Sequence, residues 1–356
     1  MNSTPFSDFR SDTVTRPTPA MREAMHRAEL GDDVFGDDPS VNRLQHAAAQ
    51  RLGFEAALFA PSGTQANLIG LMAHCGRGDE AIVGQRWHTY RWEAGGMAVL
   101  GGIQPQPIEH RPDGTLEPAA IVAAIKPDDP HFARTRLIVL ENTTGGRVLP
   151  VDYLAEVRSL ACRRGLALHL DGARLFNAAA AIDEADPWRA ARVICSSFDS
   201  ASVCLSKGLG APVGSLLLGS AGFIAQARRL RKLLGGGMRQ AGVLAAAGLH
   251  ALEHHVQRLP QDHALAASLH SALDGAVAAH ARLRDAVRFD PPSTNMLFMT
   301  VADPVAGPLL AALKAGGIGV TADTVQGGLR VRWVTHLDVG PRDVERAQHV
   351  IASFEG

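Results

Sequence analysis

The sequence predicts an α/β protein with a large domain, built on a mostly parallel sheet covered by helices, and a smaller C-terminal α+β domain. Between residues 56 and 219, short continuous apolar runs alternate with helical segments, as in a parallel sheet buried on both faces. After the three glycines at 235–237 the pattern changes to a long helical region and then a compact set of strands and helices. A chain of 356 residues is also longer than the usual length of a domain with a single hydrophobic core. We therefore expect an N-terminal segment and large domain over residues 1–245, and a small domain over 246–356.

The apolar runs give the expected elements. In the large domain we expect strands at 57–60, 81–83, 137–140, 167–170, 193–196 and 215–218, and helices at 64–74, 117–125, 152–163 and 223–234. Asp38 and Pro39 have the residue types of an N-cap and first-turn proline, which predicts a helix through residue 52. The C-terminal part predicts strands at 295–301 and 329–334 and helices at 304–315 and 341–354. In such folds, ligands bind beyond the carboxyl ends of the parallel strands.

Composition narrows the classes of function. A formal net charge of −1 gives no support to a nucleic-acid partner. The four cysteines lie far apart without a C-x-x-C pair, which favours reduced thiols over a disulfide framework. The first 16 residues lack the apolar segment of a secretory signal, and no uncharged apolar run reaches the length of a membrane span. We expect a cytoplasmic protein without a membrane partner.

Lys207 is the residue with the clearest chemical signature. It is the only charged residue between positions 201 and 222, and the chain has four lysines against 31 arginines. A lysine among apolar residues and glycines is poorly solvated, which disfavours the ammonium form and leaves the neutral amine that imine chemistry needs. Arginine cannot replace lysine in that role. The residues alone also allow a turn lysine with its ammonium group in water.

Two further motifs follow predicted strands. Pro61-Ser62-Gly63-Thr64 opens a helix, where free backbone N–H groups and the helix dipole suit a phosphate. Asp171 ends a predicted buried strand, where a carboxylate is unfavourable without a cationic partner such as a protonated pyridine nitrogen. Arg174 follows three residues later. A plain N-cap and a structural Asp–Arg pair are the respective alternatives.

Histidines and a second arginine pattern complete the candidates. His88 lies in an aromatic, polar cluster after the strand at 81–83, where it suits stacking on a flat cofactor or moving a proton. His131 lies in a loop rich in Pro and Asp. Arg330 and Arg332 alternate on a strand, so both lie on one face, where a guanidinium suits a substrate carboxylate or a charged edge strand.

A phosphate loop, a strand-end Asp and a desolvated Lys, in this order, are expected of an enzyme that uses pyridoxal 5′-phosphate. The Asp would keep the pyridine nitrogen protonated, so that the ring draws electrons from the α-carbon of an amino acid. The Lys would hold the aldehyde as an imine until the substrate amine displaces it. No metal ligand set is predicted.

Six segments together resemble the low-specificity L-threonine aldolases, which are fold-type I pyridoxal-phosphate enzymes of the transferase-like class. The resemblance covers nearly the whole chain and rests on the segments 9–17, 31–39, 61–67, 170–174, 205–210 and 235–240. It implies retro-aldol cleavage of L-threonine, L-allo-threonine and related β-hydroxy-α-amino acids to glycine and an aldehyde. It also implies a homo-oligomer, usually a tetramer.

The resemblance implies a role for each matched residue. Lys207 would form the imine, Asp171 would pair with the pyridine nitrogen, and Gly63 and Thr64 would hold the phosphate. His88 would stack on the ring and, with His131, lie near the β-hydroxyl group. The remaining expectations place Arg174 against the phenolic oxygen and the substrate carboxylate, Ser11 and Arg332 on that carboxylate, and Lys232 and Arg239 at a neighbouring subunit's site.

Two departures concern the substrate end of the pocket. Relatives tend to have Glu-Asn-Thr-His where this chain has Glu141-Asn142-Thr143-Thr144, and Arg91-Trp92 is an unfamiliar pair. Three alternatives stay open: a β-eliminating lyase that releases pyruvate and ammonia, a non-catalytic pyridoxal-phosphate-binding protein, and a cofactor-free lysine aldolase. The sequence leaves open which aldehyde and which β-carbon configuration are preferred.

Overall fold

A computed structural model describes residues 6–355, and the chain divides into two compact units. The larger unit is Pro17–Gln257, and the smaller joins Met1–Arg16 to Arg258–Gly356. The expected boundary between residues 245 and 246 therefore falls inside helix α11 (Gly242–His254). The N-terminal segment also groups with the smaller unit, because strand β1 (Ser7–Asp8) pairs with β11 (Ile318–Gly319).

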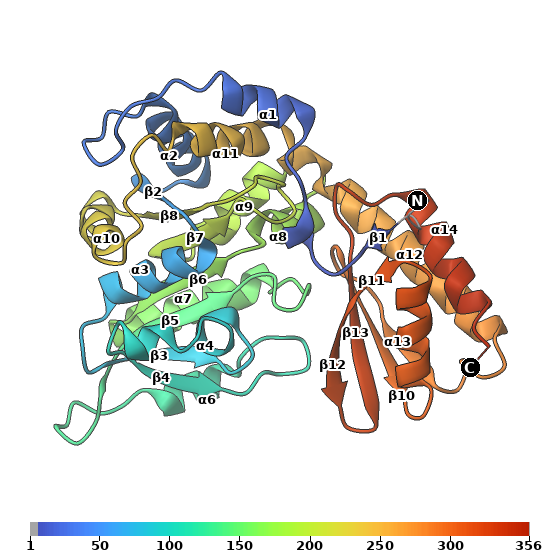
Figure 1. Ribbon diagram of the computed structural model, residues 1–356. Helices are drawn as coiled ribbons and strands as arrows, with labels where there is room; N and C mark the ends of the chain where they lie inside the picture. The colour runs from blue at the N-terminus through green and yellow to red at the C-terminus, as the bar shows by residue number, and fades with distance from the viewer. Residues whose placement is uncertain (1–5, 356) are drawn as a thin grey trace. The chain divides into compact units, whose positions relative to one another are not determined.

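The larger unit is built on a seven-stranded sheet with the order β2-β8-β7-β6-β5-β3-β4 (Figure 1). All neighbouring strands run parallel except that β8 is antiparallel to both β2 and β7. The expectation of a mostly parallel sheet is confirmed. The strands are β2 (Ala56–Ala60), β3 (Asp79–Gly84), β4 (Gln104–Ile108), β5 (Arg134–Glu141), β6 (Ala167–Gly172), β7 (Ser200–Cys204) and β8 (Ser215–Gly219).

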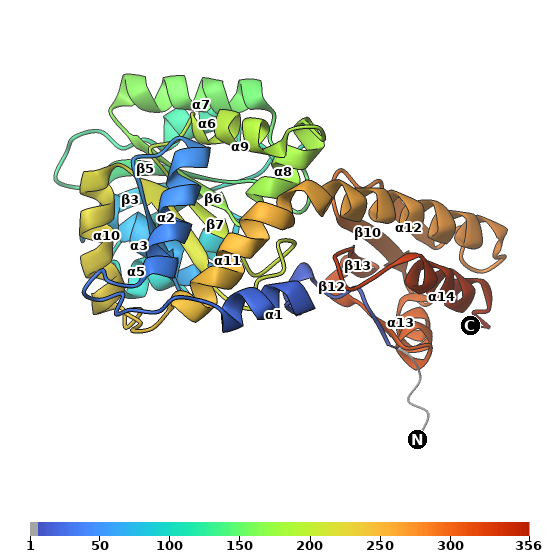
Figure 2. The same cartoon turned by 90° about the horizontal axis from the view of Figure 1, so that it is seen from above.

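Helices cover both faces of this sheet, as Figure 2 shows from above. Helices α3 and α10 bury Ile69, Ile224 and Ala227 against strands β2 and β8, while α7 packs on β6 and contacts α9 on the opposite face. The helices of this unit are α1 (Pro19–His26), α2 (Pro39–Leu52), α3 (Gly63–His74), α4 (His88–Arg91), α5 (Gly96–Val99), α6 (Pro118–Ala124), α7 (Val151–Arg164), α8 (Leu175–Ile182), α9 (Pro187–Cys195), α10 (Ala221–Leu233) and α11, with the 3₁₀ turn η2 at Val256–Arg258.

One expected strand is wrong, and two strands of the sheet are not among those expected. Residues 193–195 form the end of α9 and Ser196 is its C-cap, while Asp186 caps its start by accepting the Arg189 N–H at 3.0 Å. This helix buries Ala190, Ala191, Ile194 and Cys195, a helical spacing that a four-residue window conceals. The strand follows later as β7, and β4 is an edge strand with two prolines.

The smaller unit has a four-stranded antiparallel sheet with the order β12-β13-β10-β9. Phe9 and Trp333 pack at a ring-centroid distance of 5.5 Å in its core, and the Phe9 carbonyl accepts the Val334 N–H. Its remaining elements are η1 (Asp12–Val14), α12 (Leu259–Ala279), β9 (Val287–Asp290), β10 (Met296–Ala302), α13 (Ala306–Ala315), β12 (Thr321–Val325), β13 (Gly328–Val334) and α14 (Pro341–Ala352). Among the described helices of either unit, none is long and apolar enough to span a membrane.

Candidate active site

The carboxyl ends of the parallel strands form one edge of the large sheet. The strand register aligns Ala60 with Ser215 and Ser215 with Cys204. It also aligns Asp171 with Ser202 and with Glu141. The loops after β2, β5, β6 and β7 therefore leave the sheet at this edge, as the rule for ligand sites in such folds requires.

Lys207 lies in the turn that joins β7 to β8. Its carbonyl accepts the Gly210 N–H at 2.8 Å, and Gly210 has a φ of 75°, a left-handed conformation that glycine adopts without strain. The Lys207 side chain is half-buried and lines a small cavity together with Arg174. The turn thus places Lys207 at the strand edge, on the same small cavity as Arg174.

The start of helix α3 provides an anion site at the same edge. Ser62 is its N-cap and accepts the Gln65 N–H at 3.2 Å, which leaves the Gly63 and Thr64 N–H groups without an intrahelical partner. A Cβ atom at Gly63 would lie 3.4 Å from Ser215 Oγ, so a larger residue would crowd this cradle. The buried Ser215 hydroxyl has no hydrogen-bond partner among the described residues, and neither does that of Thr89.

Asp171, the fifth residue of β6, is almost fully buried. Its Oδ1 accepts the Ala173 N–H at 3.0 Å and its Oδ2 accepts Asn67 Nδ2 at 2.8 Å. Ser202 of β7 donates to Asn67 Oδ1 at 2.6 Å. These neutral donors hold the carboxylate in place without neutralising its charge.

His88 begins the short helix α4 and faces the same carboxylates. Its Nδ1 lies 2.8 Å from Glu93 Oε1, and its backbone N–H donates to Glu141 Oε2 at 2.6 Å. The hydrogen bond with Glu93 raises the pKa of His88 above its ordinary value, partly offset by burial; Asp171 raises it further, whereas the charge of Lys207 acts in the opposite sense. His88, Asp171 and Lys207 therefore share one electrostatic environment.

Two carboxyl groups of this site are absent from the candidates that the sequence provides. Removal from water raises the pKa of Glu93, and the side chain is only 4% exposed. Desolvation also raises the pKa of Glu141, and the negative charge of Asp171 adds to that effect. Glu93 follows His88 by five residues, but no sequence rule singles out that spacing.

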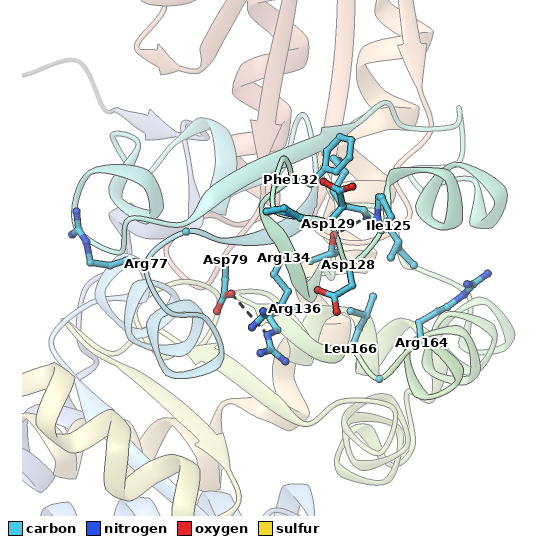
Figure 3. Close-up of a pocket in the computed structure, with 16 residues that line it drawn as sticks. Arg77, Asp79, Ile125, Asp128, Asp129, Phe132, Arg134, Arg136, Arg164 and Leu166 are labelled. Atoms are coloured by element: carbon cyan, nitrogen blue, oxygen red, sulfur yellow. Dashed lines mark hydrogen bonds and ion pairs between the residues drawn. The ribbon is translucent and has the colours of Figure 1, made fainter.

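His131 is not brought to this edge within its own chain. It lies in the loop before β5, at the amino-terminal edge of the sheet, where its side chain is 86% exposed and its Nδ1 lies 2.7 Å from Asp129 Oδ1. The same loop contributes Asp128, Asp129 and Phe132 to an open pocket of about 810 Å³, shown in Figure 3. The eight residues of β5 separate His131 from Glu141 at the other edge, so the expectation that His131 lies beside His88 does not hold within one protomer.

That open pocket is remote from the candidate site. It is lined at the starts of β3 and β5 by Asp79 and Arg134, and Arg136 pairs with Asp79 at 3.8 Å (Figure 3). This large pocket is therefore not where the candidate cofactor groups meet.

Ser11 and Arg332 both belong to the smaller unit. Arg332 Nη2 donates to the carbonyl of Arg10 at 3.1 Å, so Arg332 lies beside the segment that carries Ser11. Ser11 accepts hydrogen bonds from Thr13 N and Thr13 Oγ1. Val331 and Trp333 are buried in the core of this unit, which leaves Arg332 on the opposite face of β13, as the period of two predicts.

Lys232 and Arg239 flank the Gly235-Gly236-Gly237 turn. Arg239 Nη1 pairs with Asp32 at 2.9 Å, while Lys232 lies against Gly237. A Cβ atom on Gly236 would lie 1.9 Å from Gln65 Oε1, so this turn packs directly on the start of α3. The lack of a side chain at Gly236 permits that close approach.

The two sequence departures lie around His88. Trp87 Nε1 donates to Thr144 Oγ1 at 2.9 Å, so Thr144 fixes the residue before His88. The Arg91 guanidinium lies 5.0 Å from the ring centroid of Trp92, which is 58% exposed.

Comparisons with known proteins bear on the family and the fold of this chain. The β-eliminating lyase family matches residues 8–303. Low-specificity L-threonine aldolase of Escherichia coli K12 is 52% identical over 332 residues, which covers 93% of this chain and 94% of that protein. A threonine aldolase structure from Leishmania major has a TM-score of 0.81 at 21% identity and covers 98% of both chains. An SPT structure with the pyridoxal-phosphate internal aldimine has a TM-score of 0.72 at 16% identity and covers 98% of this chain and 86% of that one.

The two solved structures match this chain over nearly its whole length, which confirms the expected fold-type I architecture of a mostly parallel sheet and a small antiparallel sheet. The sequence relationship goes further, because it spans more than nine-tenths of both chains at more than half identity. This chain belongs to the β-eliminating lyase family, among the low-specificity L-threonine aldolases.

Proposed function

We propose that this protein is an aldehyde-lyase that cleaves L-threonine, L-allo-threonine and related β-hydroxy-α-amino acids to glycine and an aldehyde, with pyridoxal 5′-phosphate as cofactor. The observation that carries the proposal is the single sheet edge at which Lys207, Asp171 and the start of α3 meet. The relatedness to threonine aldolases supplies the reaction class.

The residues at this edge fit the three functional groups of the cofactor. The N–H groups of Gly63 and Thr64 suit the phosphate, and the unpartnered Ser215 hydroxyl lies beside them. Asp171 suits the pyridine nitrogen, because its described partners are neutral donors and its carboxylate can therefore pair with a cationic group of the ligand. The amine of Lys207 suits the aldehyde.

When bound, pyridoxal phosphate supplies an electron-withdrawing ring that stabilises negative charge on the α-carbon of the substrate. Asp171 holds the proton on the ring nitrogen that makes this withdrawal strong. His88 takes the proton of the β-hydroxyl group, and the bond between the α- and β-carbons breaks to give the aldehyde, with its electron pair left on the α-carbon. Protonation of the α-carbon then gives glycine. Arg174, Arg332 and Ser11 bind the substrate carboxylate in this proposal.

We also propose that the active form is a homo-oligomer, a tetramer built from dimers, in the cytoplasm. Lys232 and Arg239 would contribute to a neighbouring protomer's site. His131 stays a catalytic candidate only at another protomer's site, since its own loop lies at the far edge of the sheet.

Lys207→Ala tests the cofactor assignment. Borohydride treatment of the wild-type protein should fix the cofactor covalently on Lys207, detectable as a mass increase of one peptide. The variant should show no such peptide and no cleavage of threonine. A variant that retained the covalent cofactor and full turnover would refute the assignment.

Product analysis tests the reaction class. Wild-type protein given threonine should release glycine and acetaldehyde in equal amounts. A 2-oxo acid with ammonia would instead show β-elimination, and bound cofactor without turnover of any β-hydroxy amino acid would show a non-catalytic binding protein. Activity in colourless protein stripped of cofactor would indicate a lysine aldolase.

A further inference from the structure

A continuous chain of hydrogen bonds links His88 to Asp171 through two side chains that have no assigned role. His88 Nδ1 lies 2.8 Å from Glu93 Oε1, and the same oxygen accepts Asn67 Nδ2 at 2.8 Å. Asn67 Nδ2 also donates to Asp171 Oδ2 at 2.8 Å. One amide nitrogen therefore bridges two carboxylates that come from different elements.

The chemistry of these groups fixes the orientation of Asn67. An ionised carboxylate can only accept hydrogen bonds, so both Glu93 and Asp171 require the NH₂ group. The amide oxygen then faces Ser202, whose hydroxyl donates to it at 2.6 Å. Asn67, Glu93, Asp171 and Ser202 are all buried, so water does not compete for these bonds.

The same reasoning fixes the tautomer of His88. Facing a carboxylate, Nδ1 must carry hydrogen, which leaves Nε2 as the nitrogen with a free electron pair in the neutral ring. The exposed fraction of the His88 side chain is 41%, against 4% for Glu93. The imidazole therefore has one nitrogen anchored in the protein and an accessible side from which a substrate can approach.

We propose that Glu93 and Asn67 are positioning residues: they orient His88 so that its Nε2 exchanges the hydroxyl proton of the substrate, and they join His88 to Asp171 through one amide. Nε2 takes the proton as the O–H bond breaks, and the resulting imidazolium is stabilised by the Glu93 carboxylate. This inference rests on the proposed aldol cleavage and assigns residues that support it.

Other charged groups also face His88, and the contribution of Glu93 to the pKa of His88 has to be compared with theirs. Asp171 approaches from β6 and Lys207 from the turn after β7, while Glu141 of β5 accepts the His88 backbone N–H. Among these groups, Glu93 contacts the ring nitrogen directly, and its hydrogen bond is the largest contribution that raises the pKa of His88. Removing its charge should therefore lower the pKa of His88.

Glu93→Gln in the cofactor-loaded enzyme is the primary test, measured as kcat and KM for threonine across pH. A base must be neutral to act, so lowering its pKa should move the acidic limb of the kcat/KM profile toward lower pH by about one unit. The plateau value of kcat should fall on the order of 100-fold, because the imidazolium loses its partner. KM should change less than about threefold, since the variant leaves the proposed carboxylate ligands in place.

Two further measurements separate positioning from folding and from failure of the proposed function. Borohydride should still fix the cofactor on Lys207 in Glu93→Gln, whereas a wild-type protein that makes no glycine would refute the proposed function instead. His74→Gln is the matched control on helix α3, seven residues beyond Asn67 and outside this network; it should leave the acidic limb in place.

Asn67→Ala provides a second variant should Glu93→Gln lose its cofactor. It should lower kcat about tenfold or more and also weaken cofactor retention, because Asp171 loses a donor. An unchanged acidic limb and kcat in either cofactor-bound variant would overturn the proposal. Loss of cofactor from both variants would equally overturn it and assign the chain of hydrogen bonds to stability alone.

Discussion

Two neighbouring layers of polar side chains cross the same three elements of the large unit, and they differ in the groups that they contain. The outer layer consists of Asp171 on β6, Ser202 on β7 and Asn67 on α3. The inner layer consists of His169, Ser200 and His74 on the same elements. The strand register pairs Asp171 with Ser202 and His169 with Ser200, so the layers are one side-chain repeat apart.

The inner layer is neutral. The Ser200 hydroxyl bridges two histidine rings, because its Oγ lies 2.7 Å from His74 Nε2 and 2.7 Å from His169 Nδ1. Burial lowers the pKa of His74 to about 4 and that of His169 to about 3, and each shift disfavours the charged ring. This layer fills the space beneath the site without holding charge.

The outer layer contains the carboxylate of Asp171 and is connected to His88 by Glu93. Asp171 lies at the carboxyl end of β6, where a ligand can compensate its carboxylate. The comparison indicates that one side-chain repeat along β6 and β7 separates groups suited to chemistry from groups suited to packing. Substitutions in the two layers should therefore affect different measurements.

Asp171→Asn should give the largest effect and act on catalysis. The amide cannot hold a proton on the pyridine nitrogen, so kcat/KM for threonine should fall on the order of 10³-fold. The midpoint of thermal unfolding of the cofactor-free protein should also fall, because the amide has one oxygen for the two donors, Ala173 N–H and Asn67 Nδ2, that the carboxylate accepts. Steady-state kinetics beside a thermal melt checks both statements. A near-normal kcat/KM would show that Asp171 is not needed for catalysis, and the outer layer would then not differ from the inner layer in function.

Much of the candidate site could be predicted from the sequence, because Asp171, Lys207 and the start of α3 carry local signatures. Asp171 ends an apolar strand, Lys207 stands alone among glycines, and Ser62 has the residue type of an N-cap. These signals are contiguous in sequence, so a single chain without relatives displays them.

The connections among these groups could not be predicted. Asn67 meets Asp171 across 104 residues, and Glu93 meets it only through Asn67. Strand β7 escapes prediction because Ser200 and Ser202 make it look polar, although each hydroxyl has a buried partner on other elements. The position of His131 depends on the path of the chain to the far edge of the sheet, which no motif encodes.

Acid should destabilise the protein through the inner layer. In the unfolded chain, a histidine binds a proton as pH falls below its pKa of about 6.5. In the folded protein, His74 does not bind that proton until pH falls to about 4. The free energy of unfolding should therefore fall by about 1.4 kcal/mol per pH unit for each histidine across this window. The raised pKa of Glu93 acts in the opposite sense, because its stabilisation is complete below an unfolded-state pKa of about 4.5 and is lost as pH rises.

Urea titrations of the cofactor-free protein at several pH values measure this dependence. His74→Gln should flatten the slope between pH ~6.5 and ~4, since the variant has one titrating group fewer. The same variant should retain its kcat at neutral pH. An unchanged slope would show that His74 is protonated in the folded protein, and the inner layer would then not be neutral.

The smallest expected effects come from a matched pair of serine substitutions, one in each layer. Ser200→Ala removes the hydroxyl between two histidines, and Ser202→Ala removes the one that anchors Asn67. Ser202→Ala should lower the free energy of unfolding by about 1 kcal/mol, the usual value of one buried hydrogen bond, and Ser200→Ala by about 2 kcal/mol, because its hydroxyl bonds two rings. The pair separates in turnover: Ser202→Ala should lower kcat several-fold because Asn67 gains freedom to turn, whereas Ser200→Ala should leave kcat as in the wild type. Equal losses of kcat would mean that both layers support catalysis alike. In that case, loss of the Ser200 hydroxyl would displace Asp171 through β6.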